Sequence, residues 1–304
     1  MVTNPKFKLP GLEFVDFIGS GGFGSVYKYR NSFYPSKLYA VKQVQFVSVV
    51  KQLRNANITW TEAKAMEKAE KLMLREVQIQ YLIEEQERTR KTEEWNIPVF
   101  YFVSADPDSS KDFLFISEYC EKSNLASIIA ESLKTKIPLQ EQEILRIFYG
   151  VLKAVRVMHN LKIAHRDIAA NNIMFDAKNV PKLIDFGAGR IADNAYSQST
   201  MVFTKAFYSA PELDDPNYVC TDDLIIKGDI WQLGIVLYEM LDPPLFQRKI
   251  SLIQTRNFSL LAKAPYSKEI KALVEKICVD DPTKRPTVDE ILQDGLFQDL
   301  KVIN

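Results

Sequence analysis

The sequence predicts a two-lobed α+β fold, in which a small strand-rich lobe precedes a large and mostly helical lobe. A length of 304 residues suits two domains, or one large unit with two lobes. The first hundred or so residues mix short alternating or apolar runs with one long helical segment, whereas strand signals become rare after Tyr119. We therefore expect residues 1–119 to form the N-terminal lobe and residues 120–304 the C-terminal lobe.

The N-terminal lobe is expected to contain several strands and one long helix. Apolar or alternating runs bounded by turn residues predict strands at residues 14–18, 25–29, 38–44, 100–103 and 113–118. Residues 61 to about 87 predict the helix, because they are rich in Ala, Glu, Lys, Met and Leu and contain neither Gly nor Pro. Thr61 is a suitable N-cap. In the C-terminal lobe we expect helices at residues 141–160, 230–241 and 269–279, with short strands around 173–175 and 182–184.

The composition disfavours several classes of protein. Lys plus Arg and Asp plus Glu both number 39, so the zero net charge gives no sign of a nucleic-acid partner or an anionic membrane surface. The cysteines, Cys120, Cys220 and Cys278, are isolated and show neither a disulfide framework nor metal-ligand spacing. We see no signal peptide and no long apolar run, so we expect no membrane span and a cytoplasmic or nuclear location.

A glycine-rich turn between the first two predicted strands points to phosphate binding. Residues 18–26 read Ile-Gly-Ser-Gly-Gly-Phe-Gly-Ser-Val and match the pattern G-x-G-x-x-G-x-V. Glycines let the backbone turn tightly and approach phosphate oxygens without interference from a Cβ. In a dinucleotide-binding site the glycines open a helix, but here a strand follows, which disfavours a dinucleotide enzyme.

Lys42, in the third predicted strand, is a candidate phosphate ligand. Alone it could be an exposed edge lysine, so the functional interpretation needs a glutamate on the following helix to hold its ammonium group. Glu76 is the best candidate, because apolar residues accompany it along the helix. Three other glutamates of this helix compete with it, namely Glu62, Glu67 and Glu70.

The C-terminal lobe carries two polar motifs. The first is His165-Arg166-Asp167 with Asn172 five residues after Asp167, and the second is Asp185-Phe186-Gly187, thirteen residues beyond Asn172. Either motif alone could be a polar surface cluster or an ordinary turn. Their order and separation together are improbable by chance.

With these motifs in order, the chain resembles a eukaryotic-type protein kinase domain from about residue 12 to residue 300. Three further motifs of that family follow, which are Ala210-Pro211-Glu212, residues 229–234 reading Asp-Ile-Trp-Gln-Leu-Gly, and Arg285. Each pattern is loose alone, but the ordered series is specific. The resemblance implies an antiparallel sheet and a long helix in the N-terminal lobe. It also implies a phosphotransferase that uses ATP and Mg²⁺, with Mn²⁺ as an alternative metal.

The resemblance implies a role for each matching residue. Asp167 would orient the acceptor hydroxyl and take its proton, while Lys42 would contact the α- and β-phosphates and pair with Glu76. Asn172 and Asp185 would hold the metal ion. The residues implied to contact the nucleotide are Ile18, Gly19, Ser20, Gly21, Gly22, Phe23, Gly24, Val26, Ala40, Lys42, Ser117, Glu118 and Cys120.

Other matching residues imply supporting roles. Glu212 and Arg285 would form a buried ion pair. Asp229 would brace, from its helix, the segment from His165 to Asn172, which is the catalytic loop of the family. Ser117 would lie at the back of the adenine pocket, where so small a side chain leaves the rear of the pocket accessible. Glu118 and Cys120 would present backbone groups to adenine.

The chain departs from the family pattern on the acceptor side. Ala169 stands where serine/threonine kinases carry a lysine, and with Ala170 it is closer to tyrosine kinases, whose loop arginine is replaced here by Asn171. Tyr208 fits the serine/threonine pattern, but Lys205 replaces the expected threonine. We hypothesise that Lys205 is a catalytic residue that supplies the cation missing at Ala169. A substrate-docking or solvated lysine is the alternative.

Two segments point to regulation. Residues 47–68 lengthen the gap between Lys42 and Glu76 by about four helical turns over the family norm, and would extend the helix or form a docking surface. Residues 188–204 contain several hydroxyl side chains, of which Thr200 and Ser199 are the favoured phosphorylation sites, because a phosphate there would have Arg166 as a partner.

The favoured function is that of an ATP-dependent protein kinase that phosphorylates serine or threonine in a protein substrate. A tyrosine or dual-specificity kinase stays open. A pseudokinase scaffold is less favoured, because the lysine and metal-binding residues that pseudokinases usually lose are present. A small-molecule kinase would not normally carry Ala210-Pro211-Glu212 with Arg285. The sequence leaves the substrate and the oligomeric state open.

Overall fold

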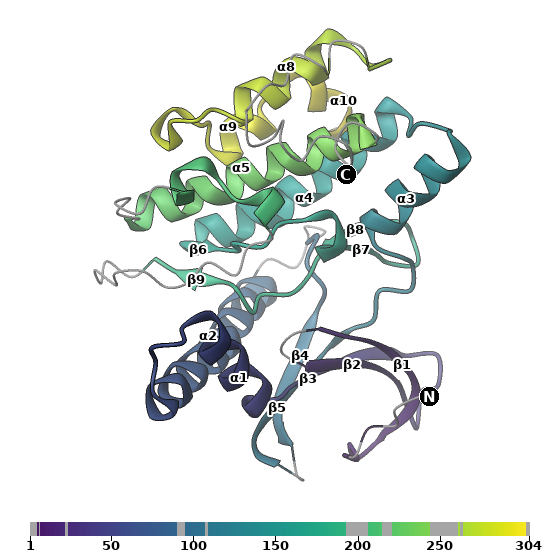
Figure 1. Cartoon of the computed structure of the whole chain (residues 1–304). Coiled ribbons are helices and arrows are strands. Elements are labelled where there is room, and N and C mark those ends of the chain that lie inside the picture. Colours follow the sequence, from purple (N-terminus) through teal and green to yellow (C-terminus); the bar gives the residue numbers. More distant parts are fainter. Residues whose placement is uncertain are drawn as a thin grey trace. The chain divides into compact units, whose positions relative to one another are not determined.

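The chain of the computed structural model divides into two units (Figure 1). The first comprises Met1–Lys91 and Pro98–Cys120, and the second comprises Thr92–Ile97 and Glu121–Asn304. The structure describes residues 5, 7–21, 24–89, 95–106, 109–192, 206–214, 221–243, 261 and 264–301. Over this part of the chain, no helix has the length and apolar character needed to cross a membrane.

The first unit is built on an antiparallel five-stranded sheet with the order β1-β2-β3-β5-β4. Its strands are β1 (Leu12–Ser20), β2 (Gly24–Asn31), β3 (Leu38–Val44), β4 (Phe100–Asp106) and β5 (Ser109–Glu118). Each expected strand is present, and most extend a few residues beyond the predicted bounds.

One face of this sheet is packed with aromatic and aliphatic side chains. Because successive residues of a strand point to opposite faces, alternate residues of β2, β3 and β5 enter the same core. This core consists of Tyr27, Tyr29, Tyr39, Val41, Leu114 and Ile116, together with Phe7 and Leu9 from the N-terminal segment. The residues that alternate with these in the three strands, such as Val26 in β2 and Ser117 in β5, therefore lie on the other face.

The segment between β3 and Glu76 forms two helices. α1 (Phe46–Ala56) begins where the Phe46 N–H donates to the buried Asp112 carboxylate of β5 at 2.9 Å, and α2 (Glu62–Thr89) follows after a short turn. The Lys64 N–H donates to Thr61 Oγ1 at 3.3 Å, so the expected N-cap is confirmed. The long insertion thus extends α2 at its N-terminal end and adds a separate helix that packs against it.

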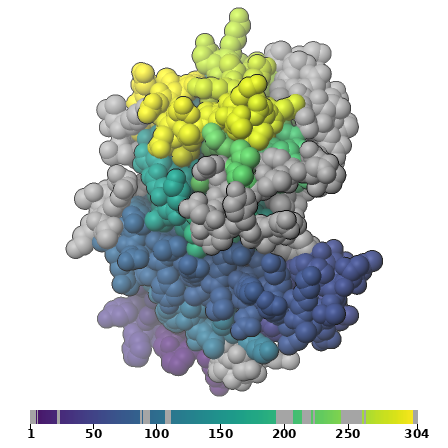
Figure 2. All heavy atoms as spheres, turned by 90° about the vertical axis from the view of Figure 1, so that its left-hand side faces the viewer, coloured from purple at the N-terminus to yellow at the C-terminus, as the bar shows by residue number. Residues whose placement is uncertain are grey.

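The outer side of α1 and α2 is open to solvent in the first unit. Figure 2 shows the two helices as one continuous blue surface. Val47 in α1 and Ile58 between the two helices are apolar and are 75% and 90% exposed. This surface is compatible with the docking role expected for residues 47–68, which stays a prediction.

The second unit is mostly helical. Its longer helices are α3 (Leu125–Thr135), α4 (Glu141–Asn160), α5 (Asp222–Leu241) and α8 (Lys268–Ile277), followed by the short α9 (Val288–Leu292) and α10 (Gln298–Lys301). α5 contacts both α4 and α8, and α4 also contacts α9 (Figure 1). Residues 229–241 of α5 are all buried, so this helix is the central element of the unit.

Short strand pairs hold the loops at one end of these helices. β6 (Ile163–Ala164) pairs with β9 (Arg190–Ile191), and β7 (Ile173–Phe175) pairs with β8 (Pro181–Leu183). The two predicted motifs lie in the loops after β6 and β8. Each of these loops therefore follows a strand that is held by hydrogen bonds to its partner strand and by packing against α4.

Candidate active site

One face of the first unit's sheet collects residues expected to contact a nucleotide. The strand register pairs Val26 with Lys42, Lys42 with Phe115, and Ala40 with Ser117. Directly paired residues lie on the same face of an antiparallel sheet, and so do residues two apart in one strand. Val26, Ala40, Lys42 and Ser117 therefore share the face opposite the aromatic core.

Lys42 makes an ion pair with Glu76, as predicted. The distance from Lys42 Nζ to Glu76 Oε1 is 2.7 Å, and the Glu76 side chain is only 6% exposed. Glu76 faces the sheet because it belongs to the buried stripe of α2, whose other members are Ala65, Ala69, Met73, Ile79 and Ile83.

The competing glutamates of α2 do not reach Lys42. Glu67 is exposed and binds Lys71 at 2.5 Å, and this hydrogen bond lowers the pKa of Glu67. The Glu62 carboxylate lies 3.7 Å from Arg54, on the turn between the two helices. Glu67 lies about 180° around the helix from Glu76 and Glu70 is exposed, whereas Glu62 lies almost four turns before Glu76.

The glycines of the turn between β1 and β2 serve different purposes. A Cβ on Gly24 would lie 1.7 Å from the Gln43 carbonyl oxygen, so the approach of β2 to β3 itself demands glycine there. A Cβ on Gly19 or Gly21 would meet no protein atom within 4 Å. Ile18 beside them is 45% exposed. Gly22 and Phe23 lie outside the described residues.

The end of β5 is tied to the segment before β4. The Glu118 N–H donates to the Val99 carbonyl at 2.8 Å, and the Val99 N–H donates to Glu118 Oε2 at 3.0 Å. Cys120, two residues later, is buried. The expected contacts of Glu118 and Cys120 with adenine stay predictions.

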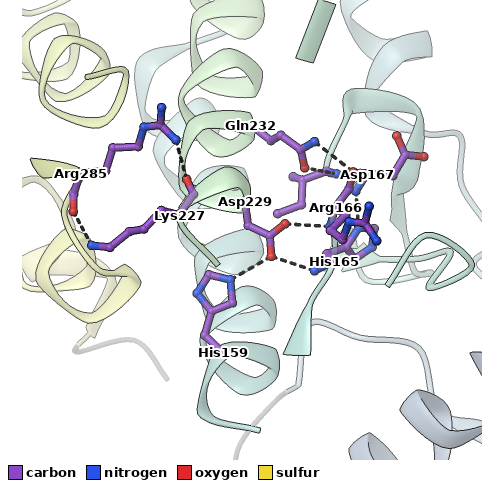
Figure 3. Close-up of polar contacts among 9 residues, drawn as sticks. His159, His165, Arg166, Asp167, Lys227, Asp229, Gln232 and Arg285 are labelled. Carbon is purple, nitrogen blue, oxygen red and sulfur yellow. Dashed lines mark hydrogen bonds and ion pairs between the residues drawn. The ribbon is translucent and has the colours of Figure 1, made fainter. Parts of the chain in front are cut away.

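In the second unit, Asp229 of α5 holds the start of the catalytic loop. Its Oδ2 accepts from the His165 N–H at 2.8 Å and its Oδ1 from the Arg166 N–H at 2.7 Å (Figure 3). His159 Nε2, near the end of α4, lies 2.9 Å from Oδ2. Asp229 is fully buried, so these polar partners satisfy a carboxylate that would otherwise be costly to bury. The predicted brace is confirmed.

Asp167 is held by Asn172. Asn172 Nδ2 donates to the Asp167 carbonyl at 2.8 Å and to Asp167 Oδ2 at 2.7 Å. The Asn172 carbonyl accepts from the Ile184 N–H at 2.9 Å, which places Asp185 next to this loop. The structure therefore brings Asp167, Asn172 and Asp185 together within the second unit.

His165 supports Asp167 as a neutral ring. His165 Nδ1 accepts from the Asp167 N–H at 3.2 Å, and Nε2 lies 3.1 Å from the Ile184 carbonyl, to which it can only donate. This network selects the Nε2–H tautomer. Burial lowers the pKa of His165, against the opposing effect of the carboxylates of Asp229, Asp167 and Asp185.

Asn172 and Asp185 form a sparse set of oxygen donors. The described residues contain no group of three or more His, Cys, Asp or Glu side chains arranged to hold a metal ion. Mg²⁺ is commonly bound by one or two carboxylates, with water and substrate phosphates completing the shell, whereas Zn²⁺ needs a closed nitrogen or sulfur set. The residues present therefore fit Mg²⁺.

Residues 12–297 of the chain match the family described as protein kinase domain. The chain belongs to this family. It is 30% identical to the serine/threonine-protein kinase Nek2 of Mus musculus over 74% of this chain and 52% of Nek2. It is 26% identical to the cell cycle serine/threonine-protein kinase CDC5/MSD2 of Saccharomyces cerevisiae, over 91% of this chain and 35% of that protein.

A third relative is the serine/threonine-protein kinase cst-1 of Caenorhabditis elegans, 33% identical over 58% of this chain and 35% of cst-1. The chain thus spans about half or less of the length of these relatives. Family membership confirms the assignment as a protein kinase domain and the α+β kinase fold. All three named relatives are serine/threonine kinases, the class that the sequence favours.

The kinase domain's Glu212 and Arg285 form the predicted buried ion pair. Arg285 Nη1 and Nη2 donate to the two Glu212 carboxylate oxygens at 2.7 and 2.6 Å. The guanidinium also donates to three backbone carbonyls and lies 5.1 Å from the ring centre of Trp231. This bidentate pair fixes the segment before α5 to the segment after α8.

Tyr208 links the kinase domain's Ala210-Pro211-Glu212 segment to the catalytic loop. Its hydroxyl donates to Glu239 Oε2 of α5 and lies 3.5 Å from the Ala170 N–H, which donates to it. Burial and the Glu239 carboxylate raise the pKa of Tyr208. Lys205, Ser199 and Thr200 lie outside the described residues.

Sequence reasoning gave no role to three polar residues of this site, which are His159, Gln232 and Glu239. A signal for the last two does exist, because residues 230–241 are otherwise almost wholly apolar. A polar side chain in such a helix has to find a buried partner. The partners themselves lie 31 to 66 residues away in the sequence.

Proposed function

We propose that this chain transfers the γ-phosphate of ATP to serine or threonine hydroxyls of a protein substrate. The observation that carries the proposal is the ion pair between Lys42 and Glu76 at 2.7 Å, on the same sheet face as Val26 and Ala40. A lysine fixed by a buried glutamate, rather than solvated, suits a phosphate ligand. The serine/threonine names of the relatives support the choice of acceptor.

Residues of the first unit would hold the nucleotide. Lys42 would contact the α- and β-phosphates, with Glu76 keeping its ammonium group in place. Gly19 and Gly21 would let the backbone approach the phosphates, because neither packing nor a left-handed backbone accounts for glycine at these positions. Ile18, Val26 and Ala40 would supply an apolar surface for the adenine ring.

Residues of the second unit would carry out the transfer. Asn172 and Asp185 would hold Mg²⁺, with Mn²⁺ as an alternative, and the bound metal would neutralise charge on the phosphates. Asp167 would orient the acceptor hydroxyl and take its proton. The bond from Asn172 to Asp167 Oδ2 would restrain the carboxylate rotamer before the acceptor arrives, while the bond to the Asp167 carbonyl holds the backbone.

Lys205 would supply the cation on the acceptor side. Ala169 and Ala170 are buried and carry no charge, so the catalytic loop offers no cation at either position. If Lys205 has this role, Lys205→Ala lowers kcat more than it changes the KM for ATP. Unchanged activity would show instead that Lys205 is solvated or serves in docking.

The test is phosphorylation of a peptide library by the full chain with Mg-ATP, followed by phosphoamino-acid analysis. We expect phosphoserine and phosphothreonine, and no signal from Lys42→Met or Asp185→Asn. Phosphotyrosine would change the acceptor class. ATP binding without transfer would identify a pseudokinase, and transfer that persists in Asp185→Asn would contradict the site assignment.

A further inference from the structure

Gln232 of α5 binds the two peptide groups on either side of Asp167. Its Oε1 accepts from the Ile168 N–H at 2.9 Å, and its Nε2 donates to the Arg166 carbonyl at 3.1 Å (Figure 3). The side chain is 3% exposed, so both bonds are shielded from water. One neutral amide thus clamps the backbone before and after the proposed catalytic base.

The clamp acts where the backbone is strained. Arg166 has a φ of 68°, in the left-handed region that non-glycine residues seldom adopt. Such a conformation persists only where the surroundings hold it. Asp229 holds the N–H of Arg166, and Gln232 holds its carbonyl, so α5 fixes this residue from both ends.

The remaining bonds of the loop show what Gln232 adds. Asp229 fixes the N–H groups that precede Asp167, and Asn172 fixes the Asp167 carbonyl. The Asp167 N–H donates to His165 Nδ1, and Gln232 binds the Arg166 carbonyl before Asp167 and the Ile168 N–H after it. Because rotation of the Arg166–Asp167 peptide would swing the Asp167 side chain, this clamp sets the direction of its carboxylate.

We propose that Gln232 is a positioning residue for phosphoryl transfer, which fixes the direction of the Asp167 carboxylate without touching the substrate. The inference rests on the proposed function, since it assigns Asp167 as the base. It assigns Gln232 a role separate from nucleotide binding. The proposal therefore predicts an effect on the rate of transfer and none on ATP affinity.

The test compares Gln232→Met with Ile277→Val. Methionine has a similar volume but removes both hydrogen bonds. Ile277 of α8 is buried and packs on α5 at Gly234, where its Cγ2 would lie 2.8 Å from an added Cβ. Gly234 lies about 200° around the helix from Gln232, so the control loosens the opposite side of α5.

We expect Gln232→Met to lower kcat by at least about tenfold, because it removes two hydrogen bonds and tenfold corresponds to roughly one. The Kd for ATP should stay within about twofold, and Ile277→Val should keep kcat within about twofold, although it also lowers thermal stability. Equal losses of kcat in the two variants would overturn the proposal. So would a parallel loss of ATP affinity.

A second measurement does not depend on activity. Amide hydrogen exchange of the wild-type chain, followed by NMR, should show the Ile168 N–H protected, and Gln232→Met should speed its exchange about tenfold. An unprotected Ile168 N–H in the wild type would refute the clamp. If the wild type transfers no phosphate, the proposed function fails, while this exchange result still decides whether the clamp exists.

Discussion

Replacing Glu212 with glutamine should strongly destabilise the second unit. Arg285 is fully buried, and all five of its N–H donors have partners. Three of these partners are neutral carbonyls, so Glu212 is the negative charge among the five. Glutamine keeps the shape but leaves a buried cation without its counter-charge. We expect the free energy of unfolding to fall by about 3–5 kcal/mol, the usual cost of breaking a buried pair from one side.

Equilibrium urea unfolding at pH 7 measures this loss, with Glu67→Gln as the control. The control makes the same chemical change in a pair whose side chains are 65% and 62% exposed, where ion pairs contribute little. We expect no resolved shift of its unfolding midpoint. If Glu212→Gln is no more destabilising than Glu67→Gln, the reasoning from burial and charge compensation is wrong.

Three further changes test other contacts. Glu76→Gln should lower kcat by up to roughly 100-fold, because Lys42 is no longer held in place, whereas Glu67→Gln on the same helix should not; peptide phosphorylation measures both. Tyr208→Phe should cost about 1–3 kcal/mol, because it removes the hydrogen bond from Tyr208 to the buried Glu239 carboxylate, and Tyr34→Phe at an exposed position should cost nothing measurable in urea unfolding. Burial lowers the pKa of His165, so its contribution is fully present above the unfolded pKa of about 6.5 and is lost as the pH falls toward the lowered folded value. Urea midpoints at pH 7.5 and 5.5 should therefore differ more for the wild type than for His165→Gln, and equal differences would contradict the buried neutral ring.

Most of the fold follows from local signals. The strands of the first unit alternate apolar and polar residues between turns, and the helix 141–160 was expected with the bounds of α4. Errors lie where local signals are weak. α5 begins eight residues before the expected residue 230, at an N-terminal part whose composition is mixed. α3 was not expected, although Asn124 caps it by accepting from the Ser127 N–H at 2.9 Å.

The insertion shows a second limit. The sequence leaves open whether residues 47–68 extend the helix or form a docking surface, and it does not show that the chain breaks near Asn57 between two helices. That break depends on tertiary burial, since α1 buries an apolar stripe and contacts α2 and β5; the stripe consists of Phe46, Val49, Val50 and Leu53. Helix propensity alone favours one continuous helix equally well.

The candidate site likewise contains residues that the sequence predicts and residues that it does not. Lys42, Asp167, Asn172 and Asp185 can be predicted from sequence, because they stand in the ordered motifs by which the chain resembles the kinase family. Their supports are predictable only in part. The brace from Asp229 follows from the resemblance to the family, but the contacts of Gln232 with the catalytic loop and of Glu239 with Tyr208 join residues that only the packing of α5 brings together.

These contacts offset a backbone strain that cannot be seen in the sequence. Arg166 and Asp185 both have a φ of 68°, and a non-glycine residue held there costs about 1–3 kcal/mol. One of them precedes the proposed base and the other is a proposed metal ligand, so the strain lies where the chemistry would occur. Asp229 and Gln232 of α5 offset part of this strain by hydrogen bonds to Arg166, and both are buried in the central helix of the second unit. The rigidity of an apolar helix is thereby passed to a loop that could not hold this geometry alone, and substitutions in α5 that never meet substrate should still change the rate of transfer.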